Sequence, residues 1–288
     1  MGWKKWAAAK AWKDGAGTLA VALAVAVVGM ASLPAQAQIT GTKHNLGSTG
    51  TGVNKFSGTA EICVFCHTPH GADNSAAVPL WNRKLGLTAP ATYTTYDSLG
   101  TSTLDGKVAP VGSVSIACLS CHDGTQSMSA VINAPGSGLA GDATWIAGTW
   151  TGANQTLGKL NATAVTNLGT DLSNDHPIGI QYGGGGVTVT NPTAATNDKD
   201  FKAPKNKAIN GTTVWWVDTE ATPNGTREKT DMMLYTRGTG PLNPGYTGQT
   251  VAEPFVECAS CHDPHTSNAT FLRISNAGSA VCLACHTK

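Results

Sequence analysis

One long apolar run stands out from an otherwise mixed pattern of polar and apolar residues. Residues 18–33 read TLAVALAVAVVGMASL, and a stretch with four lysines, 1–13, precedes them. Ala35-Gln36-Ala37 follows, with the small residues that signal peptidase recognises. A retained membrane anchor is the alternative, but the run has only 16 residues, and a spanning helix needs ~20. We therefore expect residues 1–37 to be a signal peptide.

The rest of the chain predicts little regular structure. Residues 38–288 show no sustained helical period. Residues 124–257 are rich in Gly, Thr, Asn and Ala, with turn sequences at Gly183–Gly186, Pro223-Asn224-Gly225 and Pro241–Gly245. Two short segments are candidate strands, Val187–Thr190 and Thr213–Asp218. The pattern predicts a chain that is mostly loop, with short helices and a few short β-strands.

The expected signal peptide indicates where the protein is located, and the net charge limits which partners it binds. After cleavage we expect an exported protein without a membrane span, located at the cell surface or outside the cell, or alternatively in the periplasm. The chain has 19 basic and 18 acidic residues, and residues 1–37 hold four lysines and one aspartate. The mature chain would keep 15 basic and 17 acidic residues, a net charge of −2. No basic stripe is present, so nothing indicates binding to nucleic acid.

All eight cysteines fall in one repeated pattern, C-x-x-C followed at once by histidine. The four copies are Cys63/Cys66/His67, Cys118/Cys121/His122, Cys258/Cys261/His262 and Cys282/Cys285/His286. C-x-x-C-H is the attachment sequence of c-type haem, in which the thiols form thioethers and the histidine is the proximal iron ligand. A zinc site or a redox dithiol could explain one copy. Four copies that use every cysteine predict four covalently bound haem c.

The four remaining histidines match the number of sixth ligands that four irons need. They are His44, His70, His176 and His265. We expect all four to complete bis-histidine coordination. The alternative is that some are ordinary surface or core histidines and that a methionine fills the gap, from Met128, Met232 or Met233.

Two of these histidines lie three residues after a proximal one, in CVFCHTPH and CASCHDPH. Three residues span at most ~10 Å, which is too short to pass round the edge of a rigid macrocycle and return on its opposite face. His70 and His265 are therefore expected to ligate a different haem from that of His67 and His262. Pro69 and Pro264 would stiffen these bridges because proline fixes φ.

The motifs repeat as two halves, each with one bridged motif and one simple C-L-x-C-H. Within a tetrahaem domain, 38–288, we expect haem pair 1/2 in residues 38–123 and haem pair 3/4 in residues 258–288, separated by the insert 124–257. His70 and His265 would ligate haems 2 and 4. His44 and His176 would then serve haems 1 and 3, although spacing does not fix this last assignment.

The expected fold class is a multihaem c-type cytochrome with a haem-centred core. Short helices should carry the C-x-x-C-H elements, and loops should wrap the haems, whose apolar surface replaces much of an ordinary side-chain core. Four tryptophans are expected to pack on haem faces or in a small β-rich insert: Trp145, Trp150, Trp215 and Trp216.

The stretch CASCHDPHTSNATFLRISNAGSAVCLACH resembles the doubled-CXXCH motif of multihaem cytochromes. With GTKHNLG, CHTPHG, CHDG and NDHPIG, the arrangement is similar to the tetrahaem c-type cytochromes that polymerise into extracellular conductive filaments, or nanowires. In that group a histidine near the N-terminus can complete a haem of the neighbouring subunit. His44 is the seventh residue of the predicted mature chain, so the resemblance implies head-to-tail partners of the same chain.

The sequence favours electron transport over catalysis. Six-coordinate haems pass electrons and exclude substrate, so we expect no enzyme activity. The favoured function is a subunit of a conductive filament that exchanges electrons with partner cytochromes and extracellular acceptors. A monomeric periplasmic tetrahaem carrier, with His44 ligating within its own chain, is the first alternative. A multihaem reductase is the second, and it would need an open iron position.

Overall fold

The computed structural model describes residues 38–83, 85, 93–100, 102–135, 148–175, 177–238 and 250–287. The expected signal peptide, 1–37, lies outside the described residues, as do His176 and Trp145. The description below concerns the compact unit Gln38–Lys288. Among its described residues, no helix is long and apolar enough to cross a membrane.

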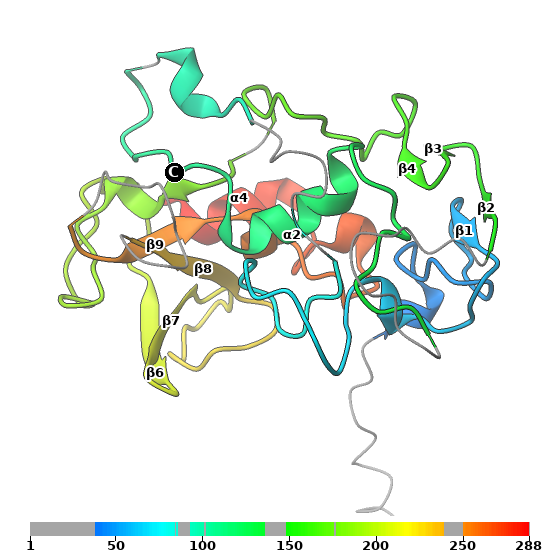
Figure 1. Cartoon of the computed structure of the whole chain (residues 1–288). Coiled ribbons are helices and arrows are strands. Elements are labelled where there is room, and N and C mark those ends of the chain that lie inside the picture. The colour runs from blue at the N-terminus through cyan, green and yellow to red at the C-terminus, as the bar shows by residue number, and fades with distance from the viewer. Residues whose placement is uncertain are drawn as a thin grey trace, which may run out of the picture. The chain divides into compact units, whose positions relative to one another are not determined.

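A five-stranded antiparallel sheet organises the second half of the chain (Figure 1). Its order is β5-β9-β8-β7-β6, with strands β5 Ile180–Gln181, β6 Lys205–Ile209, β7 Thr212–Val217, β8 Met232–Arg237 and β9 Glu253–Val256. The β6–β7 hairpin turns at Asn210-Gly211, where φ is 49° and 78°. Two positive φ angles are the requirement of the tight turn that matches strand twist. This turn therefore sets the register of the hairpin.

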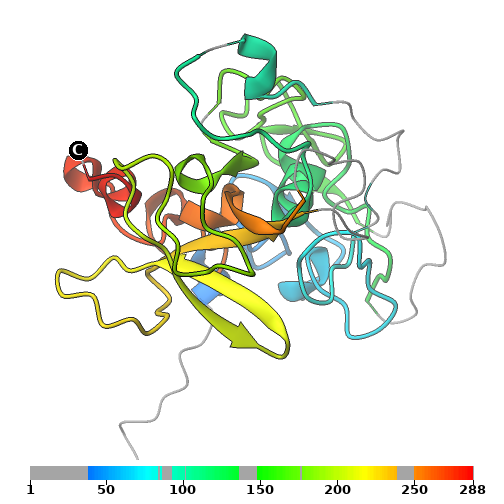
Figure 2. The same ribbon diagram turned by 90° about the vertical axis from the view of Figure 1, so that its left-hand side faces the viewer.

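The core of this half lies against the sheet. Trp215, Val217, Met232 and Leu234 are at most 3% exposed and form one apolar cluster, which also includes Ala284. Figure 2 shows the yellow and orange strands beside the red C-terminal segment, which carries Ala284. The sheet therefore supports the last C-x-x-C-H element by direct packing.

The other elements are short. The helices are η1 Gln38–Gly41, η2 Cys63–Phe65, η3 Tyr96–Leu99, α2 Ser113–His122, η4 Tyr182–Gly184, α3 Cys258–Cys261, η5 Ala269–Phe271, η6 Ala277–Ser279 and α4 Ala280–Cys285. Two small sheets pair β1 Lys55–Phe56 with β2 Trp150–Thr151, and β3 Gln155–Thr156 with β4 Lys159–Leu160. Irregular backbone connects them, as the sequence pattern predicts.

Of the two candidate strands, one is confirmed and one is wrong. Thr213–Asp218 corresponds to β7. Val187–Thr190 is not a strand, because Thr188 and Asn191 exchange backbone hydrogen bonds and close a tight turn there. The predicted packing of Trp215 and Trp216 within a β-rich insert is confirmed: both lie in β7 and are at most 2% exposed.

Candidate haem-attachment site

Each C-x-x-C-H element forms a single helical turn, as expected. The first element begins at η2, the second ends α2, and the other two coincide with α3 and α4. The backbone N–H of the motif histidine bonds to the carbonyl of the first cysteine in three elements, at His67, His262 and His286. Residues three and four apart share a helix face, so this turn places both thiols and the imidazole on one side.

The thiols of neighbouring C-x-x-C-H elements lie close to one another. All eight are free thiols. Burial raises the pKa of Cys66 to about 12, and the nearby thiol of Cys121 adds to this effect. Burial likewise raises the pKa of Cys285 to about 12, with Cys261 the next contributor. The thiols of Cys118 and Cys258 are hydrogen-bonded to each other.

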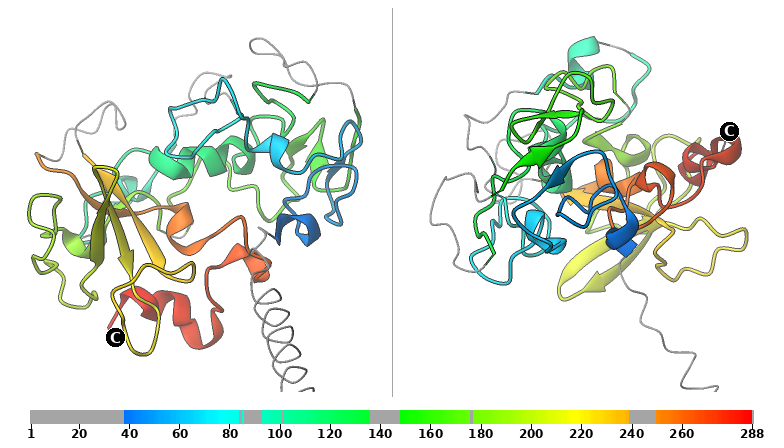
Figure 3. Two further views of the ribbon diagram at one scale, coloured as in Figure 1. Left: turned by 90° about the horizontal axis from the view of Figure 1, so that it is seen from below. Right: turned by 90° about the vertical axis from the view of Figure 1, so that its right-hand side faces the viewer.

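These thiol neighbours place the four elements in chain order, first beside second, second beside third and third beside fourth. The α2 and α3 helices, which hold the second and third elements, also pack together (Figure 3). Haems attached to consecutive C-x-x-C-H elements would therefore be bound at neighbouring positions.

In three of the four C-x-x-C-H motifs, one ring nitrogen of the histidine is hydrogen-bonded to a backbone carbonyl. His67 Nδ1–H donates to the carbonyl of Pro79 at 2.8 Å, and His122 Nδ1–H donates to that of Thr166 at 2.9 Å. His262 Nδ1–H donates to the carbonyl of Thr270 at 2.8 Å. A carbonyl oxygen can only accept, so Nδ1 carries the proton and Nε2 keeps its lone pair. This is the tautomer that metal-ligating histidines show.

Two proximal histidines face a second histidine at a separation that suits a shared metal. The ring centres of His67 and His265 are 6.1 Å apart, and those of His122 and His44 are 6.2 Å apart. A metal ion about 2 Å from each nitrogen, with about 1.1 Å from nitrogen to ring centre, would separate the two ring centres by about 6.2 Å. Each separation is the one expected if both Nε2 atoms pointed at one metal ion.

The two distal histidines are held by their own partners. Nδ1 of His265 lies 3.3 Å from Oδ1 of Asp263, and this hydrogen bond is the main cause that lowers the pKa of Asp263 to about 2. The ring of His44 stacks on Phe271 with centres 4.1 Å apart. Burial, reinforced by His122, lowers the pKa of His44 to about 4. His44 is therefore neutral near pH 7, as a ligand must be.

This geometry differs from the pairing expected from the repeat. His265 faces His67 of the first element instead of the fourth element, and His44 faces His122 instead of His67. The reason is tertiary: packing of α2 on α3 brings the two halves together, so partners come from both of them.

His70 and His286 are both exposed, and among the described residues neither ring faces another histidine. The ring of His286 lies 4.2 Å from that of Phe201. His70 is fixed only through its backbone carbonyl, which accepts from Asn133 Nδ2 at 2.8 Å and from Thr68 Oγ1 at 3.0 Å. His176 lies outside the described residues. The geometry therefore does not bring His70 to the second element, where the motif repeat predicts it.

The three methionines that were the alternative iron ligands are packed among apolar side chains. Met128 packs in a buried cluster with Leu160 and Ala164, and Met232 packs in the cluster of the large sheet. Met233 is also buried, at 8% exposed. These surroundings favour a structural role for all three.

Two buried ionisable residues, Arg83 and Glu257, stabilise the C-x-x-C-H elements, and no motif noted in the sequence includes either of them. Arg83 is fully buried and donates to Ser120 Oγ and to three carbonyls, those of Ser120, Ser127 and Met128. Glu257, one residue before Cys258, accepts from Ser115 Oγ at 2.5 Å and lies 3.4 Å from Arg237. Arg83 has no local signal, because its partners are distant in the sequence. Glu257 also caps α3, where its N–H donates to Ser260 Oγ at 2.9 Å, so the Glu-x-x-Ser spacing is a local signal for this residue.

Comparison with known families agrees with this chemistry. The model of the family described as "Doubled CXXCH motif" matches residues 251–288. This match supports a multihaem c-type cytochrome with covalently bound haem c and a haem-based role in electron transfer. No curated protein matches the chain.

Proposed function

We propose that the chain binds four haem c groups and relays electrons between them, each iron held by two histidines. The observation that carries the proposal is the pair of histidine couples, His67 with His265 and His122 with His44, at the separation of axial ligands. A bound haem supplies an iron that changes its charge by one electron. Two histidines would hold each haem iron and leave no position for a substrate, so no enzyme activity is expected.

Hydrogen bonds to neighbouring groups would hold these histidines in place. The carbonyls of Pro79 and Thr166 orient the two proximal rings, and the carboxylate of Asp263 orients His265. A carboxylate that accepts from a ligating histidine increases the basicity of that ligand. Strong nitrogen donors on both sides, without methionine, favour low reduction potentials.

We further propose that the third and fourth irons are completed by His176 and His70. His262 is partly buried, whereas His286 and His70 are both exposed. An exposed haem ligand and an exposed free histidine on one chain suit a head-to-tail contact with a second copy. In this arrangement His70, and not His44, ligates the fourth haem of the neighbouring subunit, and repetition of the contact gives a filament.

Export is part of the proposal. Residues 1–37 act as a cleaved signal peptide, and the mature filament lies at the cell surface or outside the cell, where it exchanges electrons with partner cytochromes and acceptors. A monomeric periplasmic carrier would use the same haems without the contact between copies.

Cryo-electron microscopy of the native protein, together with two matched variants, tests this proposal. Wild-type protein should form helical filaments in which density joins His70 to the fourth haem of the next subunit. His70→Ala should give single particles whose four haems remain attached. His44→Ala should still polymerise, but its ferrous form should bind carbon monoxide at one additional haem per chain.

Three results would contradict the proposal. Single particles from wild-type protein, with His70 bound inside its own chain, would remove the filament. Fewer than four haems per chain, measured by mass spectrometry, would remove the tetrahaem count. Stoichiometric carbon monoxide binding by the wild-type protein would show an open iron and favour a reductase.

A further inference from the structure

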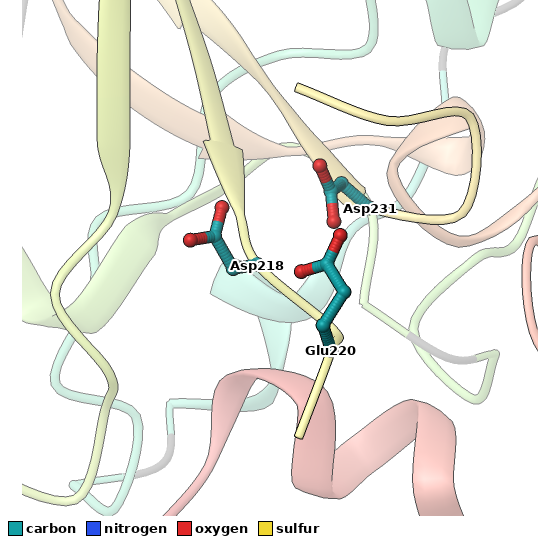
Figure 4. A group of neighbouring side chains, drawn as sticks. All are labelled: Asp218, Glu220 and Asp231. Carbon is teal, nitrogen blue, oxygen red and sulfur yellow. The ribbon is translucent and has the colours of Figure 1, made fainter. Parts of the chain in front are cut away.

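The loop between β7 and β8, 218–231, gathers acidic side chains at its base (Figure 4). Val217 pairs with Met232 in the sheet, so Asp218 and Asp231 follow on opposite sides of the last paired position. Glu220 extends from the same loop toward both of them. One carboxylate oxygen from each of the three residues lies within 4.8 Å of the others.

Neutral donors fix the two aspartates. Asp218 is 6% exposed and accepts from the indole of Trp216 at 2.6 Å and from the N–H of Gly225 at 3.1 Å. Asp231 is fully buried and accepts from the N–H of Glu228 at 2.7 Å and from that of Thr219 at 3.2 Å. A carboxylate has about four acceptor sites, so both groups keep lone pairs for another partner.

Glu220 provides an independent sign of a missing partner. Each of its two carboxylate oxygens exposes less than 1 Å², and neither has a hydrogen-bond partner. Oε2 of Glu228 is buried as well, and the Glu228 carboxyl group lies beside that of Glu220. Figure 4 shows the Glu220 carboxylate directed at the space beside the two aspartates. A buried carboxylate without a partner is costly, so this arrangement calls for a positive charge.

No basic side chain supplies that charge within the described part of the chain. Lys229 pairs with Asp263 and Arg237 pairs with Glu257, so the carboxylates of both ion pairs lie outside this cluster.

We propose that the base of this loop binds one divalent cation, Ca²⁺, through Asp218, Glu220 and Asp231, with Glu228 beside them. All donors are carboxylate oxygens, which hard cations prefer, whereas Zn²⁺ and Cu²⁺ sites use nitrogen or sulfur. Three carboxylate oxygens within 4.8 Å of one another can all reach one ion at the oxygen–metal distances of Ca²⁺, about 2.3–2.6 Å. Mg²⁺ requires about 2.0–2.1 Å and a tighter octahedral set.

The site would fix a loop that contacts a C-x-x-C-H element. Lys229 Nζ lies 3.3 Å from the carbonyl of His265 and 3.7 Å from Asp263. Arg273 Nη1 donates to the carbonyl of Lys229 at 3.0 Å. Ca²⁺ binding would therefore hold Lys229 against the segment that orients His265. The cation site itself does not depend on the proposed electron-transfer function.

Calorimetric titration of chelator-treated, haem-loaded protein with CaCl₂ tests the proposal. We expect one saturable site per chain. Glu220→Gln should weaken Ca²⁺ binding at least about tenfold, because ligand charge tunes such sites. The same variant should raise the melting temperature of the Ca²⁺-free protein, because it removes a buried charge without a partner. Glu61→Gln, the same change at an exposed position, should alter neither value.

Limited trypsin digestion gives a second measurement that does not depend on haem. Arg227 and Lys229 are exposed and lie in the loop. Ca²⁺ should slow cleavage after both residues in wild-type protein and in Glu61→Gln, but not in Glu220→Gln. Absence of saturable Ca²⁺ binding, or equal affinity in wild type and Glu220→Gln, would overturn the proposal.

Discussion

The buried carboxyl group of Glu257 should make folding stability depend on pH. Glu257 is 1% exposed, accepts from Ser115 Oγ at 2.5 Å and lies 3.4 Å from Arg237 Nε. Burial raises its pKa from 4.5 to about 7, although Arg237 and Ser115 act in the opposite direction. The folded state therefore holds this proton more tightly than the unfolded state does.

The sign and size of the effect follow from this difference. Between pH 4.5 and about 7 the folded state binds more protons at Glu257 than the unfolded state, so stability falls as the pH rises. The contribution is complete below pH 4.5 and is lost above about pH 7. The difference between the two pKa values corresponds to about 3 kcal/mol.

Chemical denaturation of wild type and Glu257→Gln from pH 4.5 to 8 measures this contribution. The amide cannot titrate, so the stability of wild type minus that of the variant should fall by about 3 kcal/mol across the range. The subtraction removes the titration of the histidines, which the two proteins share. Glu61→Gln serves as the exposed control and should match wild type at every pH. A constant difference between wild type and Glu257→Gln would refute the assignment.

Three further substitutions test residues that stabilise the C-x-x-C-H elements or orient their histidines. Arg83→Met removes four hydrogen bonds around Ser120 and should cost at least about 3 kcal/mol in denaturant unfolding; exposed Arg227→Met should cost almost nothing, and equal values would contradict the role of Arg83. Asp263→Asn weakens the acceptor of His265 and should make one haem potential more positive in a redox titration; an unchanged potential would count against it. Leu119→Ala, at a fully buried position, should lower the unfolding free energy by about 2–5 kcal/mol, and a loss below about 1 kcal/mol would show that the cavity collapses.

Local features of the chain could be predicted well. The C-x-x-C-H spacing alone predicts one helical turn with both thiols and the imidazole on the same face, and the structure has such a turn at each element. Thr213–Asp218 has the β-branched and aromatic residues of a strand, and it became β7. Val187–Thr190 has similar residues, but a local turn competes successfully with strand pairing there.

The partners of the distal histidines could not be predicted in the same way. The motif repeat suggests pairs within each half, whereas the structure places His265 beside His67 and His44 beside His122. These contacts join segments far apart in the sequence, and no local pattern encodes them. Arg83 was missed for the same reason, because it is recognisable only by the groups that surround it.

The sequence by itself therefore determined the chemistry: four pairs of thiols, each with an adjacent histidine, at a spacing that backbone geometry converts into a helical turn. Only the tertiary structure decided which histidine faces which, and where the acidic residues of the β7–β8 loop gather. The physical reason is the separation in the sequence between the residues that interact. Bonds between residues three or four apart follow from local backbone geometry, whereas the meeting of distant segments depends on the burial of Trp215, Arg83 and Glu257 in one packed unit.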